Sequence, residues 1–178
     1  MGKMVIKNGE KIFIREMEVD DAEKFLKYVK IVGDETNNLT FSSDEMNFTI
    51  EEEKKLIENF RKNENELILK AETESGEIVA GLTFSASPRK RMRHAGEFGI
   101  SVLKKYWGFG IAKGMLNFLE EWARNTNIIS KINLSVKEDN LRAIELYEKL
   151  GYRKEGLKSR AYKIDEKYYD EILMGKEL

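Results

Sequence analysis

The sequence predicts a mixed α/β fold, an α+β arrangement in which helices cover both faces of a mostly antiparallel sheet. Two strand-like runs, residues 67–71 and 78–84, flank Ser75-Gly76, a pair typical of a hairpin turn. Later, a helix-sized segment separates residues 97–102 from residues 131–136, so these two strands are expected to be parallel. The 178 residues can form one sizeable core but hardly two, which predicts a single domain over residues 1–178.

The elements before the hairpin are a strand and two helices. Apolar residues dominate positions 12–15, which are expected to form the first strand. The pattern Asp20-x-x-Glu23 is typical of a capping box and opens a first helix, and Thr49-x-x-Glu52 opens a second. The apolar residues after each box recur on one helix face: Ala22, Phe25, Leu26 and Val29 in the first helix, and Leu56, Ile57 and Phe60 in the second.

Two more helices and the remaining strands are expected in the second half. Apolar residues at helical spacing follow residue 110: Ile111, Met115, Phe118, Leu119 and Trp122. Residues 141–150 form the last helix, which Gly151 ends. Strands at residues 152–157 and 169–174 complete a sheet of about six to seven strands.

The composition excludes several classes of function. The net charge is -1, with 31 basic and 32 acidic residues, so nothing favours non-specific nucleic-acid binding. Without cysteine and with one histidine, His94, the chain is not expected to hold a metal or a Ser-His-Asp triad. No apolar run reaches membrane-spanning length and the first residues lack a signal-peptide pattern, so a cytoplasmic location is expected.

The most informative segment joins the strand at residues 97–102 to the helix that begins at residue 111. It reads Lys105-Tyr106-Trp107-Gly108-Phe109-Gly110. Glycines here allow the backbone to approach a ligand closely, and the helix N-terminus behind them favours a pyrophosphate. Taken alone, this basic-x-x-Gly-x-Gly pattern is weak evidence for a phosphate loop, because a tight turn that requires positive φ produces it more often.

A second motif follows about thirty residues later, at residues 140–152. It reads Asn-x-x-Ala-x-x-x-Tyr-x-x-x-Gly-Tyr, and its fixed positions are Asn140, Ala143, Tyr147, Gly151 and Tyr152. With both motifs in this order, the chain resembles the GNAT (Gcn5-related) family of acetyl-CoA-dependent N-acetyltransferases. In that family, a Gln/Arg-x-x-Gly-x-Gly/Ala loop holds the CoA pyrophosphate, and Lys105 replaces the usual Gln or Arg. The stretch from residue 97 onward is most similar to bacterial spermidine and ribosomal-protein-alanine acetyltransferases.

The resemblance implies an acetyl-CoA site in a V between two parallel strands that splay apart. The loop is expected to hold the pyrophosphate through Lys105, Tyr106, Trp107, Gly108, Phe109, Gly110, Ile111 and Ala112. Main-chain groups of Ile100 and Val102 would bind the pantetheine amides. Asn140 and Ala143 would contact the same arm, and Asn140 is also a favoured helix N-cap.

The implied reaction is direct attack of a primary amine on the acetyl thioester in a ternary complex, with no metal. The resemblance gives Tyr147 the role of proton donor to the leaving thiolate; the alternative is an aromatic core residue. Glu97 is the candidate that takes the amine proton, directly or through water; the alternative is a solvent-facing strand residue. Another base position of some relatives is Ser135 here, and a serine is a poor general base.

The acceptor and partners stay open at this point. The polar segment of residues 33–47 carries the carboxylates Asp34, Glu35, Asp44 and Glu45, which either attract a cationic amine or form a solvated loop. The basic loop Arg89 to His94 is most simply a solvated hairpin loop, and the alternative is a contact surface for an anionic partner. A small amine or a peptide N-terminus fits as acceptor, a homodimer is compatible with the sequence, and a non-catalytic CoA-binding module is the alternative function.

Overall fold

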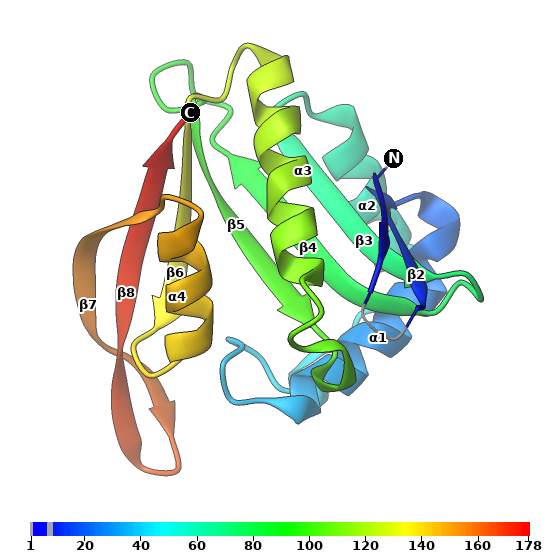
Figure 1. Cartoon of the computed structure of the whole chain (residues 1–178), viewed down its shortest axis with the longest axis horizontal. Coiled ribbons are helices and arrows are strands. Elements are labelled where there is room, and N and C mark those ends of the chain that lie inside the picture. Colours follow the sequence, from blue (N-terminus) through cyan, green and yellow to red (C-terminus); the bar gives the residue numbers. More distant parts are fainter. Residues whose placement is uncertain (1, 7–8) are drawn as a thin grey trace.

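The computed structural model describes residues 2–6 and 9–178, which build one sheet of eight strands (Figure 1). The strands follow the order β1-β2-β3-β4-β5-β6-β8-β7, and every neighbouring pair is antiparallel except β5 with β6. Their bounds are β1 Gly2–Val5, β2 Lys11–Glu16, β3 Glu66–Thr73, β4 Ile78–Ala86, β5 Ala95–Val102, β6 Lys131–Lys137, β7 Arg153–Ile164 and β8 Lys167–Glu177.

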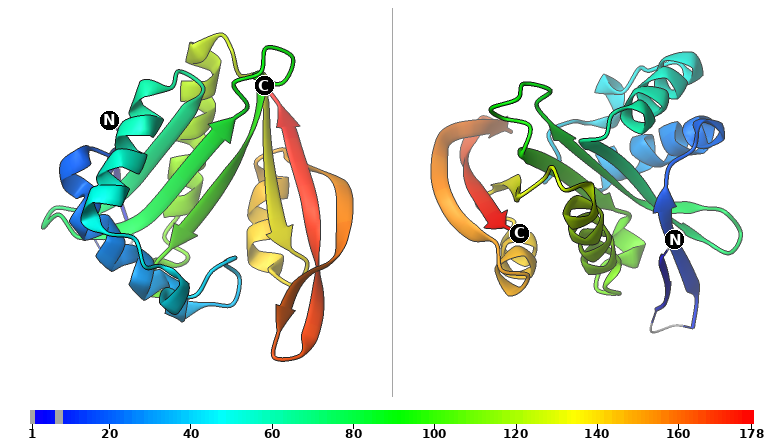
Figure 2. Two further views of the ribbon diagram at one scale, coloured as in Figure 1. Left: turned by 180° about the vertical axis from the view of Figure 1, so that it is seen from behind. Right: turned by 90° about the horizontal axis from the view of Figure 1, so that it is seen from above.

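Within the described residues, four helices cover the sheet, and both faces are covered, as the sequence predicts (Figure 2). Helices α1 and α2 lie on one face, while α3 and α4 lie on the other. Their bounds are α1 Ala22–Glu35, α2 Ile50–Lys62, α3 Ile111–Thr126 and α4 Leu141–Lys149. The part of the chain that the structure describes also contains three short 3-10 turns, at Val19–Asp21, Ser43–Glu45 and Lys104–Tyr106.

Most predicted elements are confirmed, with two corrections. The sheet has eight strands rather than six to seven, because β1 pairs with the free edge of β2. The capping box at Thr49 is confirmed, since its side chain accepts from the Glu52 N–H. The box predicted at Asp20 is wrong: the Asp21 carboxylate accepts from the Glu18 N–H at 2.9 Å and α1 begins one residue later.

The parallel pair β5 and β6 separates partway along its length. Registered pairing covers only Ala95 with Lys131, Gly96 with Ile132 and Glu97 with Asn133. Beyond these pairs, β5 stays bonded to β4 and β6 stays bonded to β8. The two strands therefore diverge as a V, which Figure 1 shows between the green and olive arrows. This confirms the splay that the family resemblance implies.

A buried ion-pair network lies between the first strands and the start of α1. Lys70 of β3 is fully buried, and its ammonium lies 2.5 Å from Asp21 Oδ1 and 2.6 Å from Glu72 Oε2. Arg15 of β2 adds a contact of 2.7 Å to Glu72. Buried charges need such partners, because an unpaired one would be very costly to desolvate.

Candidate active site

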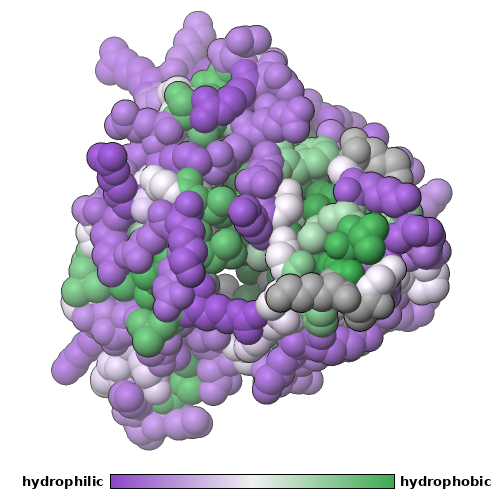
Figure 3. Space-filling model, in the orientation of Figure 1, coloured by the Kyte–Doolittle hydropathy of each residue, from purple (hydrophilic) through white to green (hydrophobic). Residues whose placement is uncertain are grey.

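A cleft of about 1070 Å³ passes between the splayed strands and joins the two faces of the sheet. It is lined from one face by α1 and α2 and from the other by the starts of α3 and α4. Figure 3 shows the surface hollowed between the two halves of the molecule, with apolar residues inside the hollow. Both sequence motifs contribute residues to this lining, so the fold brings them together at one place.

The glycine loop forms the edge of the cleft next to α3. Gly108 has φ of 86° and Gly110, the N-cap residue of α3, has φ of 83°. Both values lie in the region that only glycine enters without strain, so the tight turn requires them. The Trp107 indole donates a hydrogen bond of 2.7 Å to the Val102 carbonyl and fixes the loop on the end of β5.

Two cations lie where the loop meets the helices, and the sequence analysis missed them. The Arg142 guanidinium, from the first turn of α4, is 5.4 Å from the Trp107 ring centroid and so reaches across the cleft to the loop. Lys113, in the first turn of α3, also lines the cleft. A cation in the first helical turn opposes the helix dipole, which favours anions there. That mismatch was the available sequence signal for an anionic ligand.

Eleven of the predicted cofactor and catalytic residues line the cleft, and three do not. The lining includes Ile100, Val102, Tyr106, Trp107, Gly108, Gly110, Ile111, Ala112, Asn140, Ala143 and Tyr147. Among the predicted loop residues, the side chain of Lys105 turns away and pairs with Glu77 at 2.7 Å. Phe109 packs against the hydrophobic core instead.

The exposed backbone of β5 faces the cleft at alternate residues. Leu103 donates to the Val79 carbonyl at 2.9 Å, so odd-numbered residues of β5 bond to β4. Because successive strand residues point their N–H and C=O groups to opposite sides, Ile100 and Val102 direct theirs toward β6. Registered pairing with β6 has ended there, and the Val102 carbonyl meets the Trp107 indole.

The second motif places its residues on the opposite wall. Asn140 is the N-cap of α4, and its side chain accepts from the Ala143 N–H at 3.4 Å. Asn140 and Ser135 both line the cleft, so the capping role does not exclude contact with a ligand.

Tyr147 is 7% exposed and packs edge-on against Phe98, with ring centroids 5.7 Å apart. It lines the cleft, and within the described residues no protein group hydrogen-bonds its hydroxyl. Burial raises the pKa of Tyr147, so the hydroxyl keeps its proton at neutral pH.

Glu97 belongs to the last registered pair of β5 and β6, at the vertex of the V. It is exposed and is not among the described residues that line the cleft. Its charge reaches Tyr162 of β7, which does line it: burial, Glu171 and then Glu97 raise the pKa of Tyr162 to about 12. The Tyr162 hydroxyl donates to Glu171 Oε1 at 3.2 Å. Sequence reasoning missed Tyr162, because its motif-free strand gives no signal.

The acidic segment between α1 and α2 has local partners. Glu35 accepts from the Lys104 N–H at 2.6 Å, and Ser42 hydrogen-bonds both Asp44 and Glu45. None of the four predicted carboxylates, Asp34 included, is among the described lining residues.

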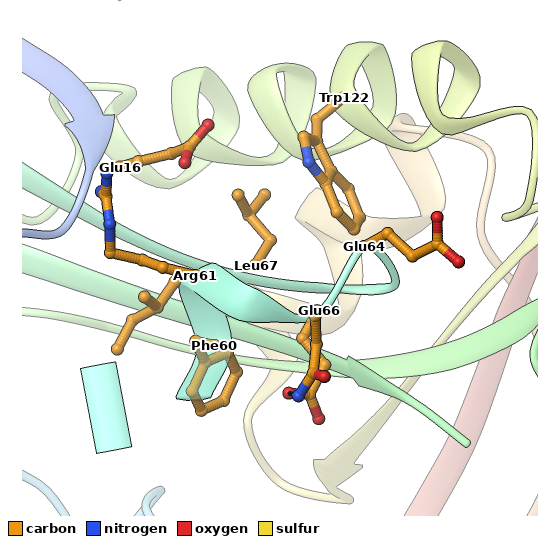
Figure 4. A pocket seen from close by; sticks show the side chains of 9 residues that line it. Glu16, Phe60, Arg61, Glu64, Glu66, Leu67 and Trp122 are labelled. Atoms are coloured by element: carbon orange, nitrogen blue, oxygen red, sulfur yellow. Dashed lines mark hydrogen bonds between the residues drawn. The ribbon is translucent and has the colours of Figure 1, made fainter. Parts of the chain in front are cut away.

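A second pocket, of about 190 Å³, lies apart from both motifs (Figure 4). Its labelled side chains come from β2, α2, β3 and α3 and from the turn before β3, and Arg61 donates to the Met17 carbonyl at 3.0 Å. Within residues 2–6 and 9–178, no His, Cys, Asp and Glu side chains form a group that could hold a metal ion. None of the helices in these residues combines the length and apolar character needed to cross a membrane.

Comparisons with known proteins agree with this fold. The model of the Acetyltransferase (GNAT) family matches residues 34–152. A relative, the L-amino acid N-acetyltransferase AaaT of Escherichia coli, is 30% identical over 101 residues, which span 57% of this chain and 62% of that protein. The structure of a GNAT acetyltransferase from Streptococcus pneumoniae superposes with a TM-score of 0.90 at 32% identity, covering 94% of this chain and 99% of that one.

A more distant structure shares the fold alone. The yncA protein of Salmonella typhimurium, solved with its cofactor acetyl-CoA, has a TM-score of 0.80 at 16% identity over 94% of each chain. A splayed parallel pair with a glycine loop at one edge and the Asn-to-Tyr helix at the other defines an acetyltransferase of this fold. The chain belongs to the GNAT acetyltransferase family.

Proposed function

We propose that this protein transfers the acetyl group of acetyl-CoA to a primary amine by direct attack in a ternary complex. The observation that carries the proposal is the cleft that passes through the sheet at the splay and is lined by both motifs. One open face can admit the cofactor and the other the amine, so that both reactants meet between the strands. A small amine is the proposed acceptor, with a peptide N-terminus as the alternative that the assay below compares.

The residues at the loop fit an acetyl-CoA site. The N-termini of α3 and α4 border the cleft, and Arg142 and Lys113 add positive charge beside the glycines. These groups would hold the pyrophosphate, with the loop contributing backbone N–H groups. The open N–H and C=O groups of Ile100, with the Val102 N–H, would bind the pantetheine amides, and Asn140 would contact the same arm.

Acetyl-CoA supplies a thioester whose carbonyl carbon accepts the amine and whose sulfur leaves as a thiolate. Tyr147 donates the proton that the thiolate needs, since burial keeps its hydroxyl protonated. Glu97, at the vertex of the V, removes the proton of the amine through water, because it does not line the cleft itself. Ser135 lines the cleft but does not serve as a base.

The test is release of free CoA thiol from acetyl-CoA, measured across a panel of amines and N-terminal peptides. Turnover with one class of acceptor is expected, and the class identifies the acceptor. Tight binding of CoA without turnover on any acceptor would instead support a non-catalytic CoA-binding module. The cytoplasmic location and the homodimer remain predictions, which fractionation and sedimentation would check.

The role of Glu97 is tested by Glu97→Gln, which keeps the shape and removes the basicity. Acetyl-CoA affinity should be unchanged while kcat falls, and the loss should shrink as pH rises because more amine is already neutral. A rise in the KM of the amine with kcat unchanged would show that Glu97 only attracts the acceptor. Unchanged kcat and KM would make it a sheet-surface residue.

A further inference from the structure

Glu53 is a buried carboxylate without a protein partner that lines the cleft. It lies in the first turn of α2 and is 4% exposed. Its Oε1 has no hydrogen-bond partner, and within the described residues no cation forms an ion pair with it. Burial raises the pKa of Glu53, as expected for a carboxylate that no neighbouring cation stabilises.

The surroundings of Glu53 make its charge unusual. The α1–α2 chamber is the part of the cleft lined by α1, α2 and the segment between them; its residues include Phe25, Val29, Phe41, Met46 and Leu56. Its lining is largely apolar. Among the described residues of these elements, Glu53 is the one charged residue that lines the chamber.

Charge is therefore separated along the cleft. Arg142 and Lys113 lie at the end formed by α3 and α4, where the lining carboxylate Asp139 is already paired with Lys137 at 2.8 Å. Glu53 lies on the opposite face of the sheet, on α2 (Figure 2). The cationic end suits an anionic cofactor, and the anionic end suits a cationic ligand.

The reacting nitrogen cannot be the partner of this carboxylate. An amine attacks only in its neutral form, and a buried ion pair would hold it protonated. A partner for Glu53 must therefore be a different cationic group of the same ligand. Because the walls between Glu53 and the reacting position are apolar, the chain that joins the two nitrogens must be apolar as well.

We propose that Glu53 binds a second cationic nitrogen of the acceptor, so that the substrate is a diamine-like molecule with two nitrogens joined by an apolar chain. This inference rests on the proposed function and names the substrate class of the same cleft. One nitrogen reacts between the strands, and the other pairs with Glu53 in the α1–α2 chamber.

The experiment compares two probes of equal chain length, 1,6-diaminohexane and n-hexylamine, by calorimetric titration of the protein saturated with CoA. The wild-type protein should bind the diamine more tightly by about tenfold or more, since a buried charge pair contributes that much. Glu53→Gln keeps the volume and hydrogen-bonding atoms but loses the charge, and it should bind both probes equally.

Glu51→Gln is the matched control, because Glu51 is an exposed carboxylate on the same turn of α2 and should leave the preference intact. Equal affinity of the wild-type protein for both probes, or a preference that survives in Glu53→Gln, would overturn the inference. The measurement is of equilibrium binding and needs no turnover. The thiol-release assay judges the acetyl transfer separately, so failure of one can be told from failure of the other.

Discussion

At the scale of single residues, Tyr147 combines a fixed ring with an available hydroxyl. The ring is held edge-on by Phe98 and by Tyr152, at centroid distances of 5.7 and 6.1 Å. Such packing gives the ring one position, so the hydroxyl reaches the same point of the cleft in every molecule. A proton donor benefits from this pre-organisation, because no reorientation is needed during the reaction.

Tyr147→Phe should lower kcat by about 10² or more while changing the KM for acetyl-CoA little, because a proton donor acts in the transition state. Steady-state kinetics with single-turnover measurements would check this. Tyr152→Phe is a useful control, since Tyr152 is buried in the same aromatic cluster but is not among the described residues that line the cleft. A kcat near the wild-type value, with chemistry rate-limiting, would reduce Tyr147 to a packing residue.

The Glu53 carboxylate is proposed to strengthen ligand binding, but its charge should lower the stability of the unliganded protein. Its folded-state pKa is raised, so its contribution is complete below the unfolded pKa and is lost as pH rises through the folded pKa. Glu53→Gln should therefore have a higher Tm than the wild-type protein at pH 8, and the difference should vanish near pH 4. Thermal unfolding across this range measures it. A lower Tm at pH 8 would mean that the carboxylate has a stabilising partner.

The sequence predicted the motif residues but not the residues whose role depends on contacts with other elements of the fold. Tyr147, Asn140 and the glycines were found because their spacing is fixed within one segment. Glu53 carried a readable signal: it lies four residues before Ile57 and seven before Phe60, at an apolar position of the helix pattern. The sequence could not show that this carboxylate lacks a partner, because its surroundings come from α1, α2 and the segment between them, which only the fold brings together.

At the scale of elements, the loop between β5 and α3 is held at both ends. The Trp107 indole bonds the last residue of β5, and the Glu35 carboxylate at the end of α1 accepts from the Lys104 N–H. Arg142 adds a cation–π contact of 5.4 Å from α4. Because three elements position it, the loop is expected to keep its shape before the ligand binds.

Gly108→Val should weaken CoA binding by about tenfold or more, because the valine side chain would extend into the ligand side of the loop. A Cβ at this position would lie 3.2 Å from Nη2 of Arg142. Calorimetry with CoA measures the effect. Gly9→Val is the matched control, because Gly9 has nearly the same φ, 87°, in the turn before β2. If both variants lost the same CoA affinity, backbone strain alone would explain the effect.

Element identities were predictable from the sequence, whereas the strand count and the splay were not. β1 was missed because its four residues alternate in burial at the sheet edge and contain no continuous apolar run. The point of splay leaves no periodic signature, since the burial alternation runs past the last registered pair, through Gly99 in β5 and through Val136 in β6. Only the family resemblance predicted it.

At the scale of the whole molecule, the Lys70 network connects β2, β3 and the start of α1. Burial opposes ionisation of Asp21 and Glu72, but the hydrogen bonds and charges of Lys70 and Arg15 outweigh it and hold both carboxyl pKa values below their ordinary range. This contribution to stability is present above the unfolded pKa values, about 4, and is lost as pH falls through the folded ones.

Lys70→Met should lower the free energy of unfolding by about 3–5 kcal/mol at pH 7, because it removes the fully buried cation of two buried carboxylates and leaves them only the partly exposed Arg15. The difference from the wild-type protein should narrow as pH falls through the lowered folded-state pKa values of these carboxyls, because below them the carboxyls are protonated in both proteins. Urea unfolding measures both effects. Lys11→Met is the control, since its exposed pair with Glu74 should contribute about 0–1 kcal/mol. A loss of similar size in both variants would contradict the buried network.

The unpaired edge of β5 lets the proposed cofactor act as an additional strand of the sheet. Without it, the N–H groups of Ile100 and Val102 face solvent in the middle of an otherwise continuous sheet, and the two halves of the sheet meet through three registered residue pairs. A bound pantetheine arm would occupy the place of a strand and bridge both halves. The amide protons of Ile100 and Val102 should then exchange slowly with solvent only while the cofactor is bound. The two halves of the sheet would be joined along their full length in that state and separated again after each turnover.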